Sequence, residues 1–446
     1  MLHANALDPQ RSLVIGNRGV GKSFWSSVLT HHETREAVAP SYPRLPLMRI
    51  QAVLGFHEDA GKDDGPAPSP AVLSALHKDG HDPEAIWRAV LLKGLGGTIG
   101  DALPTSLKDI IAWSNADVER CEHALRRADK YYLDRRETFL IVFDALDRLG
   151  RNWDIITPLT QGVLRLALDM RGFKAMKAKV FMRTDQSKDD TLFRFADASK
   201  LRSDAVALVW RREELFGLLY KYLSSNQSSK ESLLRLMGED ESAEETLEGL
   251  LSNEALQEEL FHRLAGDYMG AGPKRGRPYN WLYSHLADTF GETSPRSFIT
   301  AIQRSAEYRP PPRSSVIDHV GIRTGVQNAS SVRVQQLKED YEWIEEVLNA
   351  LDGLEVPCEP TTFIKRWRDR KTVQGITADA QAQSRLLPLE ILDSRGNPEE
   401  ALLQAMTNIG VVEFRTENRI NVPDIFRVAA GIKRRGGVRP PSARRR

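Results

Sequence analysis

Short apolar runs alternate with longer amphipathic stretches over the first half of the chain. The strand-like runs are 12–15, 47–54, 138–143, 178–182 and 205–209, and the helical stretches include 21–31, 115–133 and 154–171. Strands that alternate with helices are typical of a parallel sheet covered by helices on both faces. The pattern therefore predicts an α/β fold in which the loops that follow the strands gather at one edge of the sheet.

The first strand-like run leads directly into a glycine-rich loop and a helix. The loop reads Gly16-Asn17-Arg18-Gly19-Val20-Gly21-Lys22-Ser23, which is the spacing of a phosphate-binding P-loop. Its glycines let successive backbone N–H groups face one anion. Lys22 supplies a point charge for the β- and γ-phosphates, and Ser23 supplies a hydroxyl ligand for Mg²⁺. A glycine-rich turn that matches by chance is the alternative, and the strand before it and the helix after it disfavour that interpretation.

A second acidic strand end follows residues 138–143, which read Thr-Phe-Leu-Ile-Val-Phe. Such an apolar run predicts a strand buried on both faces. Asp144 comes directly after it and is the candidate metal ligand, while Asp147 is the candidate group for polarising the attacking water. The alternative is a core strand followed by a helix whose first acidic residues favour the helix dipole.

The run Asp144-Ala145-Leu146-Asp147-Arg148 resembles the Walker B region of STAND and KAP NTPases, which act in bacterial regulatory and anti-phage systems. The resemblance implies ATP and Mg²⁺ as cofactors, Asp144 as the metal acid and Asp147 as the catalytic acid. In many related ATPases a Glu directly follows the metal Asp, and Ala145 stands in that place here. Because of this difference, a slow switch that binds nucleotide stays open as an alternative to a fast enzyme.

Two arginines are candidate sensors of the γ-phosphate. Arg183 follows the strand-like run 178–182, which related NTPases place between the P-loop strand and the Walker B strand. Its guanidinium suits phosphate oxygens, although a surface ion pair with Asp185 is the alternative. Arg296 follows Pro295 at a predicted helix start capped by Ser294, and this resembles the second sensor of AAA+ and KAP-like ATPases. A solvated arginine at a helix terminus is almost equally compatible with that pattern.

The second half of the chain is predicted to be mostly helical. Arg211 and Arg212 open a helix and are candidate arginine fingers, although paired arginines at a helix start are usually surface residues. The basic loop 270–281 is compatible with a nucleic-acid or subunit contact, and more commonly with an exposed connection. The break at 309–332 predicts a linker before a helix from about Val332 to Leu351.

The chain near its end predicts a helix at 399–409 and then a hairpin over 411–422 that turns near Glu417-Asn418. Helices followed by such a hairpin look like a winged helix, which binds DNA in some proteins and packs against a partner in others. The tail 433–446 carries seven basic residues and no acid, which tilts this expectation slightly toward DNA or RNA.

Composition limits the remaining options. A length of 446 residues predicts more than one domain, and we place them at 1–225 for the P-loop core, 226–312 for a helical lid and 313–446 for the linker and winged-helix-like domain. A net charge of +1 argues against wholesale coating of nucleic acid. The two cysteines, Cys121 and Cys358, lie far apart and favour a reducing interior. With no apolar segment long enough to cross a bilayer, the sequence predicts a cytoplasmic protein without a membrane partner.

The preferred function is that of an Mg²⁺-dependent ATP-binding and ATP-hydrolysing switch, with an unidentified effector and ATP-dependent homo-oligomers as candidate partners. An ATP-driven DNA initiator or loader is the first alternative. A nucleotide-binding scaffold without turnover is the second, and it follows from Ala145 standing where an acid is common.

Overall fold

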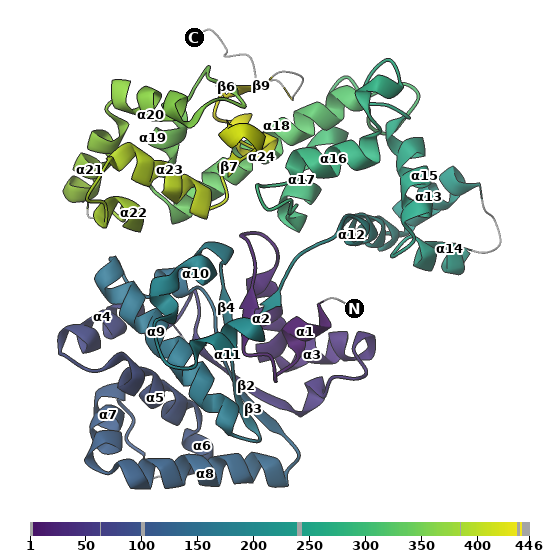
Figure 1. The fold of residues 1–446 in the computed structure, drawn as a ribbon. Helices are drawn as coiled ribbons and strands as arrows, with labels where there is room; N and C mark the ends of the chain where they lie inside the picture. The colour runs from purple at the N-terminus through teal and green to yellow at the C-terminus, as the bar shows by residue number, and fades with distance from the viewer. Residues whose placement is uncertain are drawn as a thin grey trace. The chain divides into compact units, whose positions relative to one another are not determined.

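The computed structural model describes residues 3–62, 64–99, 103–238, 243–383, 385–434 and 438. The chain forms two compact units, Met1–Leu208 and Val209–Arg446, which are drawn in Figure 1. Each unit has a hydrophobic cluster of its own.

The first unit contains a sheet of five parallel strands. They are β1 Leu13–Ile15, β2 Ile50–Phe56, β3 Thr138–Phe143, β4 Met176–Met182 and β5 Val206–Ala207, in the order β2-β3-β4-β1-β5. All five predicted strands are therefore confirmed, with bounds that shift by a few residues. The register pairs Ile15 of β1 with Met182 of β4, so neighbouring strands end at the same edge.

The burial of β3 and β4 agrees with their inner positions in the sheet. Every residue of β4 is buried, and β3 is buried from Phe139 onward. These two strands occupy inner positions, where both faces are covered by protein. The strand β4 lies between β1 and β3, which confirms the position predicted for the strand that precedes Arg183.

Helices surround this sheet. They are α1 Ala4–Leu7, α2 Lys22–Thr30, α3 His32–Val38, α4 Pro70–Lys78, α5 Pro83–Gly94, α6 Gly96–Ile99, α7 Leu107–Ala116, α8 Val118–Asp134, α9 Trp153–Asp169, α10 Thr184–Lys188 and α11 Ala198–Ser203. Short 3₁₀ turns form η1 Ala39–Ser41, η2 Leu47–Arg49, η3 Leu146–Arg148, η4 Met170–Gly172 and η5 Asp190–Phe193. Helix α2 packs on β2, β3 and β4, which fixes its N-terminus at the sheet edge. The α/β class predicted from the alternating pattern is confirmed.

The insert between β2 and β3 departs from expectation at one point. Helices α5 to α8 lie together at the lower left of Figure 1. The prolines and the glycine of the segment 63–70 predict a flexible surface stretch, and residue 63 lies outside the described residues. Ala67 is buried in the core of the first unit, and the Ser69 hydroxyl caps α4 by accepting a hydrogen bond from the Val72 N–H. Helix capping and apolar burial fix this stretch in a way that composition did not show.

The second unit is mainly helical. Its helices are α12 Arg212–Ser224, α13 Gln227–Met237, α14 Ala243–Gly249, α15 Glu254–Ala265, α16 Pro278–Leu286, α17 Pro295–Ala306, α18 His319–Asp340, α19 Ile344–Asn349, α20 Pro360–Asp369, α21 Thr372–Gln383, α22 Leu389–Leu392, α23 Pro398–Asn408 and α24 Asp424–Arg427, with 3₁₀ turns η6 Pro273–Arg275 and η7 Thr416–Asn418. Short strands pair as β6 Glu355–Val356 with β9 Lys433–Arg434, and as β7 Glu413–Phe414 with β8 Ile420–Asn421. Within the described ranges, none of the helices has the length and apolar content needed to cross a bilayer.

The predicted linker at 309–332 is wrong in its second half. Helix α18 begins at His319, because the Asp318 carboxylate accepts hydrogen bonds from the first free N–H groups of the helix. Gly321 and Gly325 interrupt the apolar period of this helix, so the sequence pattern does not predict it. A Cβ at Gly325 would lie 2.2 Å from the Ala301 carbonyl oxygen of α17, so glycine is needed where the two helices pack.

The predicted hairpin is present. Strands β7 and β8 pair antiparallel, and Glu417 and Asn418 at their turn have positive φ values of 63° and 57°. Helices α20, α21 and α23, which precede the hairpin, pack on one another. The winged-helix assignment and the three domain bounds remain predictions.

Candidate functional site

The glycine loop connects β1 to α2 in a conformation that needs its glycines. Gly19 and Gly21 have φ values of 83° and 103°, a region that favours glycine, and Gly21 caps α2. Gly16 is constrained by space, since a Cβ there would lie 2.7 Å from Cγ2 of Val20 and 3.1 Å from the carbonyl oxygen of Leu208. The loop is therefore as tightly curled as the motif predicts.

The remaining loop residues line this curl. Val20 and Asn17 are buried, Arg18 is half-buried, and the Lys22 Nζ donates hydrogen bonds to the carbonyl oxygens of Gly16 at 2.8 Å and Asn17 at 3.0 Å. Burial lowers the pKa of Lys22 to about 8, and the attraction of Asp144 opposes that shift. The loop thus closes around one cation, the group expected to meet phosphate oxygens.

Asp144 lies at the end of β3 as predicted. Its backbone N–H donates to the Phe56 carbonyl oxygen at 3.0 Å, which ties the end of β3 to the end of β2. Its carboxylate accepts a hydrogen bond from the Ser23 hydroxyl, while burial raises its pKa. The two predicted metal ligands are therefore in contact, and their oxygens form a donor set of the kind that Mg²⁺ prefers.

Asp147 reaches the same edge of the sheet through an unusual turn. Ala145 has φ 56° and ψ 40°, a left-handed conformation that costs a non-glycine residue about 1–2 kcal/mol. This residue leads into η3, which carries Asp147. The Asp147 carboxylate is close enough to Lys22 to raise its pKa, and its Oδ2 lies 3.6 Å from Arg183 NH1. The backbone strain lies between the two predicted acids, where functional sites often hold it.

Arg183 joins these groups from the end of β4. Its guanidinium binds Asp185 through two hydrogen bonds, Nε to Oδ1 at 3.1 Å and NH2 to Oδ2 at 2.8 Å. The surface ion pair with Asp185 that was considered as an alternative is thus present, but Arg183 is only 9% exposed. Arg183 is therefore buried beside Asp147, while its partner Asp185 is half-buried.

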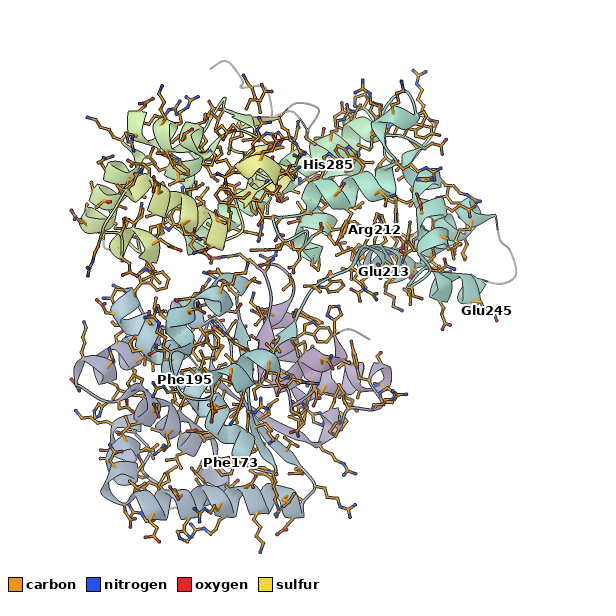
Figure 2. The ribbon with its side chains drawn as sticks, viewed as in Figure 1. Phe173, Phe195, Arg212, Glu213, Glu245 and His285 are labelled. Carbon is orange, nitrogen blue, oxygen red and sulfur yellow. The ribbon has the colours of Figure 1, made fainter. Side chains whose placement is uncertain are left out.

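The other predicted arginines belong to the second unit. Arg296 is an exposed residue in the first turn of α17, and Ser294 caps that helix as predicted by accepting from the Ser297 N–H at 3.2 Å. Arg212, labelled in Figure 2, pairs with Glu254, and Arg211 pairs with Glu213 at 3.0 Å. These arginines have local partners or solvent around them, and their roles toward a nucleotide remain predictions.

Sequence reasoning did not find two supports of this site. Asp185 holds the Arg183 guanidinium in place, whereas the sequence suggests Asp185 only as the partner in a surface ion pair. Glu58, two residues after the end of β2, forms an ion pair with Arg148 of η3 and so ties the Asp147 turn to the neighbouring strand. No signal in the sequence links Glu58 to Arg148, because they lie 90 positions apart.

Together, the parallel sheet and the loop define an α/β protein with a P-loop. Comparison with known protein families gives no match, and comparison with curated proteins gives none either. In shape, the chain is similar to a Walker-type ATPase of Pyrococcus abyssi, with 10% identity, a TM-score of 0.38, and 95% of this chain and 93% of that chain covered. It is also similar to the Aeropyrum pernix ORC2 protein solved as ADPNP–ADP complexes, with 10% identity, a TM-score of 0.30, and 94% and 86% covered. At these scores we draw no conclusion from either likeness.

Proposed function

We propose that this protein is an Mg²⁺-dependent ATPase that acts as a nucleotide-controlled switch. The observation that carries the proposal is the convergence of Lys22, Asp144, Asp147 and Arg183 at one edge of the sheet. They come from three neighbouring strand ends, β1, β3 and β4. A half-buried ammonium group, two acids and a guanidinium around an anion-binding loop suit phosphoryl transfer to water.

Binding would use the loop and Lys22. The backbone N–H groups of the loop and the N-terminus of α2 favour an anion. The Lys22 ammonium, now held by two carbonyl oxygens, would move its hydrogen bonds to the β- and γ-phosphates. Ser23 and Asp144 would hold Mg²⁺, which neutralises charge on the phosphates when bound.

Hydrolysis would depend on Asp147 and Arg183. Asp147 would orient a water molecule and accept its proton while the water oxygen bonds to the γ-phosphorus and the bond to the β-phosphate oxygen breaks. Arg183 would stabilise the charge on the γ-phosphate. Its guanidinium is held by Asp185 through two hydrogen bonds. Since Arg183 must exchange that partner for phosphate, we expect slow turnover, which suits a switch better than a fast enzyme.

The wider role rests on the resemblance to STAND and KAP NTPases alone. It supports a cytoplasmic regulator, for instance in anti-phage defence, that signals to an effector protein or forms ATP-dependent homo-oligomers. Arg296 would then report the nucleotide state to the helical region and the hairpin region.

The test is ATP hydrolysis by the full chain, wild type beside Lys22→Ala and Asp147→Asn, each with and without double-stranded DNA. We expect slow wild-type turnover that both substitutions abolish and that DNA does not change. Strong stimulation by DNA would instead favour an initiator or loader. Tight ATP binding without turnover would favour a scaffold, and absence of binding would overturn the proposal.

A further inference from the structure

An exposed aromatic side chain lies beside the phosphate loop. Phe24 directly follows Ser23 in the first turn of α2, and its side chain is 60% exposed. Most large apolar side chains of the first unit lie in its core. An exposed phenyl ring in the first turn of the helix that caps the loop therefore needs an explanation other than packing.

Phe24 is the outer member of an aromatic cluster. Its ring meets the Trp25 ring edge-on at 5.1 Å, and Trp25 is stacked on His3 at 5.7 Å and meets Tyr42 edge-on at 6.2 Å. His3 precedes α1 and Tyr42 follows η1, so two further segments pack on Trp25, which in turn contacts the ring of Phe24. Trp25 is only 7% exposed, and its indole N–H has no hydrogen-bond partner among the described residues. The cluster is thus a rigid backing that also holds an unused donor.

The charged groups of the site come from other elements. Asp144, Asp147 and Arg183, which act electrostatically on Lys22, follow β3 and β4. A triphosphate on a P-loop puts its γ-phosphate at the lysine and its α-phosphate along the loop N–H groups and the helix start. We therefore expect the nucleoside to leave the loop near the first turn of α2. Phe24 occupies that turn.

We propose that Phe24, backed by Trp25, stacks on the base of the bound nucleotide and favours a purine nucleoside triphosphate. This inference rests on the proposed function. An exposed, edge-supported phenyl ring offers a flat face at little entropic cost, and a base that stacks on it gains affinity without a specific hydrogen bond. Purines gain more than pyrimidines because their larger ring system covers more of the phenyl face.

The experiment compares ligands with and without a base. Binding of ATP, UTP and inorganic tripolyphosphate, each with Mg²⁺, is measured by calorimetry for the full chain as wild type, Phe24→Ala, Phe24→Leu and Phe24→Tyr. We expect Phe24→Ala to weaken ATP binding by about tenfold and to leave tripolyphosphate binding within about twofold of wild type. Phe24→Tyr keeps a ring and should bind ATP like wild type, while Phe24→Leu keeps only apolar bulk and should resemble Phe24→Ala. The preference for ATP over UTP should shrink in the variants without a ring.

Three results would overturn the inference. The first is an equal loss of affinity for ATP and tripolyphosphate in Phe24→Ala, which would mean a damaged loop. The second is no loss of affinity for either ligand in Phe24→Ala. The third is wild-type affinity for ATP in Phe24→Leu. The proposed function fails separately, because a wild type that binds neither ATP nor tripolyphosphate has no phosphate site, and the stacking proposal then falls with it. Thermal unfolding without ligand should be the same in all four proteins, since the ring is exposed.

Discussion

Two lysines in the first unit, Lys22 and Lys179, show what separates a candidate functional site from a structural tether. Lys22 in the loop and Lys179 in β4 each donate to two main-chain carbonyl oxygens, and burial lowers the pKa of each, to about 8 and about 7. Lys179 bonds the carbonyl oxygens of Ala6 and Asp8 at 2.8 and 2.7 Å and so fastens α1 to the sheet. If only the charge and the hydrogen bonds of the two lysine side chains are compared, the two regions look alike.

The difference lies in the surroundings of the ammonium groups. Lys22 has the carboxylates of Asp144, Asp147 and Asp185 and the guanidinium of Arg183 around it. Lys179 is fully buried, and among the described residues the only charged groups that shift its pKa are Asp8, which raises it, and Arg11, which lowers it. A lysine with several acids beside an open loop is poised to exchange partners, whereas a lysine closed in by backbone can only hold it. The following predictions test that distinction.

The largest expected effect is on hydrolysis and binding in Lys22→Ala. Loss of the ammonium removes charge-assisted hydrogen bonds to phosphate, and we expect nucleotide affinity to fall by about 100-fold and turnover to fall to background. The matched control is Lys179→Met, which should bind nucleotide within about threefold of wild type in the same titration. Equal losses in both variants would remove the distinction between site and tether.

Asp147→Asn should separate turnover from binding. An amide accepts a proton poorly, so single-turnover hydrolysis should slow by about 100-fold, while nucleotide affinity stays within about threefold. The control is Asp190→Asn, an exposed acid paired with Arg202, which should leave both quantities unchanged. Undiminished turnover in Asp147→Asn would assign the water to another group.

Gly16→Ala should weaken nucleotide binding by about tenfold. The new Cβ would lie 2.7 Å from Cγ2 of Val20, and the loop must shift to relieve that overlap. At Gly97 of α6 an added Cβ would meet no atom within 4 Å, so Gly97→Ala is the matched control and should bind nucleotide like wild type. Calorimetry on both variants checks this, and normal affinity in Gly16→Ala would show that the loop has room.

Lys179 should make stability depend on pH. Its pKa is about 7 in the folded protein and 10.5 in the unfolded chain, so between these values the unfolded state binds more protons and stability rises with pH. The slope can reach about 1.4 kcal/mol per pH unit. Urea unfolding of wild type and Lys179→Met from pH 7 to pH 9 should therefore diverge by about 2 kcal/mol. Parallel curves would mean that the two carbonyl oxygens keep Lys179 charged.

Ala145→Gly should have the smallest effect and should stabilise. Glycine adopts the left-handed conformation without strain, so the free energy of unfolding should rise by up to about 1 kcal/mol. Ala112→Gly, at an exposed position in α7, should instead destabilise by about 1 kcal/mol. Chemical denaturation of both variants checks the two opposite signs. A lower free energy of unfolding in Ala145→Gly would mean that packing of the Ala145 methyl group stabilises the fold.

Local patterns predicted much of the first unit. The apolar runs located every strand of the sheet because buried parallel strands need continuous apolar sequence. The loop motif located Gly16 to Ser23 because its backbone geometry needs those residue types at fixed spacing. Helix starts at Ser294 and Asp318 differ in this respect. The first was predicted from its proline, and the second was missed because glycines interrupt the apolar period of α18.

Sequence by itself determined the α/β class, the loop and the positions of the two acids of the candidate site, since each depends on residues close together in the chain. Only the tertiary structure decided that Ser23 contacts Asp144, that Arg183 is bound by Asp185 beside Asp147, and that Lys179 is a tether. It also decided that Phe24 is exposed on the helix that follows the loop. The physical reason is that burial and partner choice arise from segments far apart in the chain, which folding brings together and which no local period records.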